Sequence, residues 1–99
     1  MSKKILEAEI EAYFVKCVEE QLGGVALKLE VKGRRGWLDR LVLLPNGAVC
    51  FAELKTKKGR LSALQKRRIA TLKNLGHCCW VLYTLEDVDF WVDALQRKH

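Results

Sequence analysis

A chain of 99 residues, 49% of them hydrophobic and 30% charged, has material for one core, so we expect a single domain over residues 1–99. No run approaches the roughly 18 consecutive apolar residues of a membrane-spanning helix, which excludes a membrane-spanning protein of that kind. The net charge of +6 is uneven, because residues 28–73 hold 13 Lys and Arg against 3 acids, and residues 54–85 contain no acid. Such a segregated basic stretch favours a polyanionic partner over a solvated surface, on which acids and bases alternate.

The start of the chain and the cysteines both indicate a cytoplasmic protein. The basic residues at positions 3 and 4 are followed at once by acids, not by the apolar region of a secretory signal. The cysteines lie in apolar stretches, form no CxxC pair and have no histidine at zinc-finger spacing, so we expect buried thiols more than disulfides or metal ligands. We also expect no organic cofactor. The cysteines are Cys17, Cys50, Cys78 and Cys79.

A helix is predicted over residues 3–22, because apolar residues recur at spacings of three and four until Gly23. At 100° per residue, Glu9 lies opposite the apolar arc. Glu7, in contrast, projects inward within that arc, and Glu11 lies at its margin. The helix therefore offers one inward-facing acid, Glu7.

Three strands are predicted next, over Val25–Val31, Trp37–Leu44 and Ala48–Lys55, from alternating and then continuous apolar residues. The Pro-Asn-Gly sequence at 45–47 predicts a hairpin between the last two strands, since Asn-Gly tolerates the positive φ that a tight turn demands. The apolar run that opens the third strand suggests burial on both faces.

A loop then leads to a second helix. Ser62, followed three residues later by Gln65, is a capping-box signature, so this helix is predicted to begin after Ser62 and to run to Leu75. Cys78–Thr84 is predicted to be a fourth strand, and Glu86–Gln96 a final helix with acids in its first turn. The order αβββαβα predicts an α/β protein, a mixed sheet of four strands with flanking helices.

Asp39 and Glu53 form the candidate catalytic pair, because the predicted hairpin makes their strands neighbours and lets the carboxylates converge. Two carboxylates give an oxygen-only site of the kind that Mg²⁺ prefers, with positions left for water and phosphate. Lys55 projects from the same face as Glu53, where it can assist deprotonation of the attacking water or steady charge on the phosphoryl oxygens. Metal-assisted phosphodiester hydrolysis needs this combination. The alternative is a simple Glu53–Lys55 ion pair, or two exposed charges on the strand.

Three segments in this order resemble the VRR-NUC (virus-type replication–repair nuclease) family. They are GWLDR at 36–40, FAELK at 51–55 and GRLS at 59–62, the last followed by Gln65. The family belongs to the PD-(D/E)xK nucleases, so the resemblance implies a restriction-endonuclease-like core in a stand-alone, single-domain member. One departure is Leu38, where the family commonly has proline; it removes a φ restraint but no ligand.

The resemblance also implies roles for individual residues. Asp39 and Glu53 would bind Mg²⁺ or Mn²⁺ together with the main-chain carbonyl of Leu54, and Lys55 would be the catalytic lysine. The first-helix glutamate of the family best matches Glu7, which would reach the metal through water. Its helix glutamine matches Gln65.

The function implied is a structure-specific DNA endonuclease, since small stand-alone relatives are associated with four-way (Holliday) junctions. One active site cuts one strand at a time, so a C2 homodimer would supply the second site and twice the basic surface. Two alternatives stay open. One is a nucleic-acid-binding module whose acids are structural, and the other is a nuclease that acts on flaps or nicked duplexes.

Basic side chains near the candidate site are expected to contact DNA phosphates. Two of them stand in the loop before the second strand, and five follow the catalytic strand. Directly after this loop, Trp37 either stacks on a base or supports the active-site loop, and the sequence favours neither. The predicted phosphate contacts are Arg34, Arg35, Lys57, Lys58, Arg60, Arg67 and Arg68.

Overall fold

The computed structural model describes residues 7–56 and 59–97. Its elements follow one another in the order helix, three strands, helix, strand, helix, which confirms the predicted αβββαβα arrangement. They are α1 (Glu7–Glu20), β1 (Val25–Lys28), β2 (Arg40–Leu43), the 3-10 turn η1 (Pro45–Gly47), β3 (Val49–Leu54), α2 (Ala63–Asn74), β4 (Cys78–Leu82) and α3 (Leu85–Arg97).

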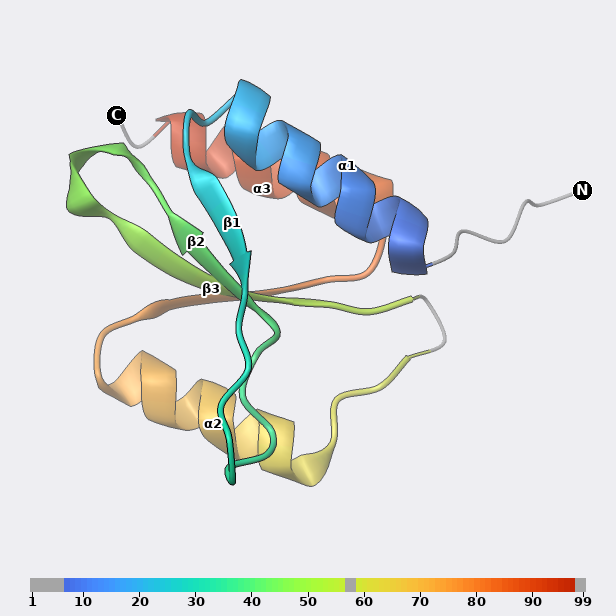
Figure 1. Cartoon of the computed structure of the whole chain (residues 1–99), viewed down its shortest axis with the longest axis vertical. Helices are drawn as coiled ribbons and strands as arrows, with labels where there is room; N and C mark the ends of the chain where they lie inside the picture. The colour runs from blue at the N-terminus through green and yellow to red at the C-terminus, as the bar shows by residue number, and fades with distance from the viewer. Residues whose placement is uncertain (1–6, 57–58, 98–99) are drawn as a thin grey trace, which may run out of the picture.

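The four strands form one mixed sheet in the order β1-β2-β3-β4. The first three are antiparallel neighbours, and β4 lies parallel to β3, which α2 makes possible by crossing over between them. Helices α1 and α3 lie together on one side of the sheet, whereas α2 lies on the other side (Figure 1). This is the predicted α/β fold.

The β2–β3 hairpin turns at η1, as the Pro-Asn-Gly sequence predicts. Asn46 has a φ of 66° and Gly47 a φ of 78°, the left-handed values that these two residue types adopt at least cost. The turn sets the register, in which Leu43 pairs with Val49 and Arg40 with Ala52. Register fixed in this way decides which side chains face each other at the far end of the hairpin.

The core lies between the sheet and the pair α1 and α3. Phe14 of α1 and Trp91 of α3 are fully buried and stack with their ring centroids 4.9 Å apart. Val42 and Cys50 cover them from the sheet. Cys17 and Cys50 are buried thiols as expected, whereas the two cysteines that open β4 are only half-buried. Within the described residues, no helix is long and apolar enough to cross a bilayer.

Two expectations about the strands are wrong. The ladder of β1 and β2 ends at Lys28 and Arg40, with one further hydrogen bond from the Leu29 N–H to the Asp39 carbonyl at 2.7 Å. Residues 29–39 form a loop, in which Gly33 and Gly36 take positive φ values of 72° and 85° that a strand does not have. The predicted burial of β3 on both faces holds for its last three residues but not for Val49, which is 41% exposed.

Candidate active site

Asp39 and Glu53 lie directly opposite each other where the β2–β3 hairpin ends. Arg40 pairs with Ala52, so the next residues across the two strands are Asp39 and Glu53, on the same face. The backbone N–H of Asp39 donates to Glu53 Oε1 at 3.0 Å, and the backbone N–H of Leu54 donates to Asp39 Oδ1 at 3.4 Å. The hairpin therefore brings the two carboxylates together and holds them by reciprocal hydrogen bonds.

The pair is electrostatically unfavourable as it stands. Glu53 is only 5% exposed and Asp39 is half-buried. Burial and the nearby Glu53 carboxylate raise the pKa of Asp39 to about 6, although the Leu54 N–H and the Arg40 guanidinium act in the opposite direction. Two close carboxylates that resist joint ionisation suit a divalent cation, whose charge offsets their repulsion.

The donor set fits a hard cation of this kind. Both side chains offer oxygen only, which Mg²⁺ and Mn²⁺ prefer. In the described ranges, no group of three or more His, Cys, Asp or Glu side chains is arranged so that it could hold a metal ion. Asp39 and Glu53 would therefore hold an ion here, and water and main-chain oxygen would complete its coordination shell. The carbonyl of Leu54 remains the predicted main-chain ligand.

The second oxygen of Glu53 meets two donors. Gln65 Nε2 donates to Glu53 Oε2 at 3.0 Å, and Lys55 Nζ lies 3.4 Å from the same oxygen. An ion pair between Glu53 and Lys55 thus exists, as the simple alternative required. That alternative does not account for the burial of Glu53, nor for the convergence of Asp39 and Gln65 on it.

Gln65 reaches Glu53 because the start of α2 orients its side chain. The predicted capping box is present: the Gln65 backbone N–H donates to Ser62 Oγ at 3.0 Å, and the Ser62 N–H donates to Gln65 Oε1 at 3.0 Å. With its oxygen engaged by Ser62, the amide presents its nitrogen to the Glu53 carboxylate. One glutamine both caps a helix and holds a catalytic candidate, which the sequence indicated only as two separate features.

Comparison with known proteins gives two informative matches, although no protein-family model matches the chain. The protein described as "Putative nuclease p44", from Acyrthosiphon pisum secondary endosymbiont phage 1, is 44% identical over 78 residues, which are 79% of this chain and 83% of that protein. A solved structure described as "VRR_NUC domain" superimposes with a TM-score of 0.82 and 30% identity over 88% of this chain and 94% of its own. The chain belongs to the VRR-NUC family. It is therefore a nuclease by family.

In this VRR-NUC chain the acid that α1 brings near the carboxylates is Glu11, not Glu7. The prediction that Glu7 points inward is wrong: it is exposed at the first residue of α1, one turn before Ile10, the first buried residue of that helix. Glu11 Oε1 lies 3.6 Å from Arg40 Nη2, and its charge is among those that raise the pKa of Asp39. The place of Glu11 at the margin of the apolar arc was the signal that could have identified it.

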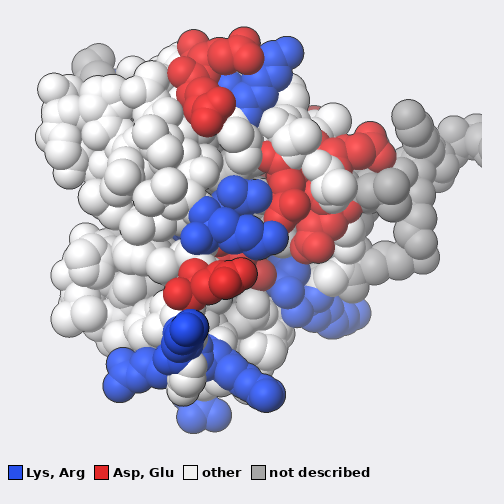
Figure 2. All heavy atoms as spheres, viewed as in Figure 1, with Lys and Arg blue, Asp and Glu red and all other residues white. Residues whose placement is uncertain are grey.

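The predicted phosphate contacts divide into exposed and engaged residues. Figure 2 shows basic side chains over the lower part of the molecule, near the β1–β2 loop and α2, and also at the centre and top of this face, with acidic side chains between these groups. Arg68 is only half-buried and is engaged within the protein, with its guanidinium 4.7 Å from the Trp37 ring centroid. Lys57 and Lys58 lie outside the described residues. The exposed members are Arg34, Arg35, Arg60 and Arg67.

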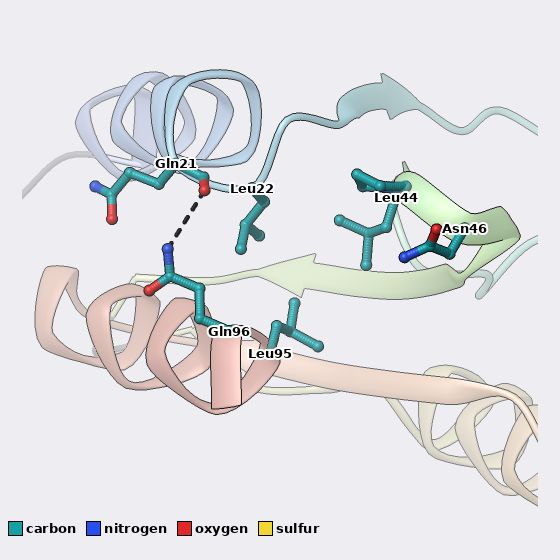
Figure 3. A pocket seen from close by; sticks show the side chains of 7 residues that line it. Gln21, Leu22, Leu44, Asn46, Leu95 and Gln96 are labelled. Carbon is teal, nitrogen blue, oxygen red and sulfur yellow. Dashed lines mark hydrogen bonds between the residues drawn. The ribbon is translucent and has the colours of Figure 1, made fainter. Parts of the chain in front are cut away.

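A cavity of about 270 Å³ lies elsewhere, between the ends of α1 and α3 and the hairpin turn (Figure 3). Leu22, Leu44 and Leu95 give it apolar walls, and Gln96 Nε2 donates to the Gln21 carbonyl at 3.3 Å across its edge. The turn is the opposite end of the hairpin from Asp39 and Glu53. The cavity is therefore not part of the active site.

Proposed function

We propose that this chain is a Mg²⁺- or Mn²⁺-dependent DNA endonuclease that hydrolyses phosphodiester bonds at Asp39, Glu53 and Lys55, with residues 1–99 acting as one domain. The observation that carries the proposal is the pair of facing carboxylates at the hairpin end, each of which accepts a backbone N–H from the opposite strand, with the Lys55 ammonium 3.4 Å from Glu53. When bound, the ion supplies Lewis-acid stabilisation of charge on the phosphate.

The chain's own residues orient the site and place charge in it. Gln65 fixes one oxygen of Glu53, and the Asp39 backbone fixes the other, so this carboxylate needs little reorganisation. Lys55 is 22% exposed and stands between Glu53 and solvent, where a phosphate would arrive. There its ammonium steadies the charge that develops on the phosphoryl oxygens, or assists the loss of a proton from the attacking water.

For the substrate we propose branched DNA such as a four-way junction. The exposed arginines of the β1–β2 loop and of α2 lie on the elements that border Asp39 and Glu53, so a phosphate backbone that reaches the site passes close to them. A four-way junction is two-fold symmetric in outline and needs two coordinated cuts. Two copies related by a C2 axis would present two sites to it.

The fold offers a surface for such a homodimer on the sheet face away from α1 and α3. Val25, Leu43 and Val49 are neighbours in register across three strands and are 47%, 40% and 41% exposed. Their alternates in each strand face the core, so these side chains point the other way. An exposed apolar patch of this kind suits a second copy of itself, and it leaves the Asp39–Glu53 end of the hairpin open.

The dimer is tested by sedimentation. Val49→Lys should convert a wild-type dimer to monomer, whereas Leu75→Lys, at an exposed leucine after α2, should not. A wild-type monomer at working concentration that still cuts junctions symmetrically contradicts the dimer.

The function is tested by incubating the protein with four-way, flap, nicked and linear DNA, with Mn²⁺ or with a chelator. Cleavage of the four-way junction that requires the ion is the expected result. Preferential cleavage of flaps or nicked duplexes supports nuclease activity and overturns the proposal that the substrate is a four-way junction. Binding without cleavage under every condition identifies a nucleic-acid-binding module and overturns the catalytic proposal.

A further inference from the structure

The loop between β1 and β2 is fastened to α2 by three contacts. Gly36, with φ of 85°, approaches so closely that a Cβ there would lie 2.5 Å from Leu64 Cγ, so only glycine permits this packing. The Arg68 guanidinium lies over the Trp37 ring, 4.7 Å from its centroid. Arg68 Nε also donates to the Arg35 carbonyl at 3.0 Å. A single side chain of α2 thus holds two residues of the loop.

This loop leads directly into the catalytic pair. Trp37 precedes Asp39 by two residues, and Leu38 between them is 1% exposed. The position of the loop therefore adds to the hairpin contacts in setting where the Asp39 backbone and carboxylate lie. Trp37 is half-buried against α2, so of the two roles open from the sequence the structure favours support of the loop over stacking on a base.

Helix α2 consequently contacts the Glu53 carboxylate directly and the loop that leads to Asp39. Gln65 holds Glu53 directly, and Arg68, one helical turn later, holds the segment that carries Asp39. We propose that Arg68 is a positioning residue for Asp39 and not a phosphate contact. A guanidinium suits this task because it stacks on an indole and donates from Nε at once, which a lysine ammonium does not do. The role in metal binding, but not the fastening of the loop, rests on the proposed function.

Arg67 is the matched control. It is the preceding residue, carries the same charge on the same helix, and is exposed. Both Arg67→Ala and Arg68→Ala remove one positive charge, so any effect of net charge is common to them. Only Arg68→Ala removes the contacts to Trp37 and Arg35.

The first measurement is hydrogen exchange of amides 33–39 in the metal-free protein. Arg68→Ala should speed exchange there by about tenfold, as expected for the loss of one stacked cation and one hydrogen bond. Arg68→Lys should lie close to Arg68→Ala, and Arg67→Ala should match wild type. Equal exchange in Arg68→Ala and wild type overturns the fastening, whatever the protein's function.

The second measurement is calorimetric titration with Mn²⁺ alone, without DNA. Arg68→Ala should bind Mn²⁺ several-fold more weakly than wild type, with Arg67→Ala unchanged. Arg67→Ala should instead flatten the salt dependence of DNA binding by about 0.9 in log–log slope, whereas Arg68→Ala should leave the slope as in wild type. Unchanged Mn²⁺ affinity in Arg68→Ala overturns the positioning role. Absence of Mn²⁺ binding in wild type overturns the proposed metal-dependent function, and the exchange result still decides the fastening.

Discussion

The two sides of the sheet are held by different forces. On the α1 and α3 side, packing dominates, with Phe14 and Trp91 stacked and fully buried. On the α2 side, Leu72 is the one buried residue of the helix, and polar contacts from Gln65 and Arg68 attach it to the rest of the site. Stability should thus depend mainly on the first side and catalysis on the second. A substitution on either side tests this division.

Loss of the Glu53 charge should have the largest effect on catalysis. Glu53→Gln keeps the shape of the side chain but removes a charge from the proposed metal site, and several kcal/mol of transition-state stabilisation correspond to roughly a 10³-fold slower cleavage. DNA binding should persist, since removing a negative charge does not weaken attraction to phosphate. Single-turnover cleavage and fluorescence anisotropy measure the two quantities. Cleavage by Glu53→Gln near the wild-type rate would show that Glu53 is not part of the catalytic site.

Trp91→Ala should have the largest effect on stability. Truncation of a fully buried Trp costs about 3–5 kcal/mol, which lowers the Tm of a domain of this size by more than about 10 °C. Phe90→Ala, at the neighbouring position and 68% exposed, is the control and should change Tm little. Thermal unfolding compares them. If the two variants have the same Tm, the core does not lie where the structure places it.

Lys55→Ala should slow turnover by about 10²-fold and leave Mn²⁺ binding intact, because an ammonium does not ligate a cation. Calorimetric titration and single-turnover cleavage separate the two effects. Loss of Mn²⁺ binding in a folded Lys55→Ala protein contradicts the assigned role.

Asp39→Asn should stabilise the protein at pH 8 but not at pH 4. The pKa of Asp39 is raised from 3.8 to about 6, first by burial and then by Glu53, so the folded state holds this proton more tightly than the unfolded state. The stability linked to the proton is complete below pH 3.8 and is lost as the pH rises through about 6. Asn does not ionise and so escapes this loss. With a chelator present, the Tm of the variant should exceed that of wild type by a few degrees at pH 8. A lower Tm at pH 8 contradicts the unfavourable burial of the Asp39 charge beside Glu53.

Ser62→Ala should have the smallest effect, because it removes one cap hydrogen bond of about 1 kcal/mol and leaves the Ser62 backbone contact to Gln65 in place. Tm should fall by several degrees, with a small loss of cleavage. Ser62→Asn, which keeps a capping oxygen, should restore both. If Ser62→Asn does not restore cleavage, the helix cap is not what orients the Gln65 side chain for cleavage.

Most of the fold could be predicted from local signals in the sequence. The turn at Asn46, the capping box of Ser62 and Gln65, and the spacing of apolar residues each act over a few residues, and the register that places Asp39 opposite Glu53 follows from the turn. These features could be predicted from the sequence because their causes lie within the same short segments.

Features set by the docking of distant segments could not be predicted in this way. Whether Glu7 or Glu11 approaches the site depends on how α1 lies over β2, which helical periodicity does not specify. The engagement of Arg68 depends on a loop folding back onto α2, and the sequence had predicted that Trp37 opens a strand instead of lying in this loop. In both cases the local pattern lacked information on the segment that packs against it.

The most direct test of the account is single-turnover cleavage of a four-way DNA junction by wild type and Asp39→Ala, each with Mn²⁺ and with a chelator. We expect rapid cleavage by wild type with Mn²⁺, none with the chelator, and none by Asp39→Ala in either condition although it still binds the junction. Cleavage by Asp39→Ala at the wild-type rate, or by wild type with the chelator, would contradict hydrolysis at a metal site built on Asp39 and Glu53.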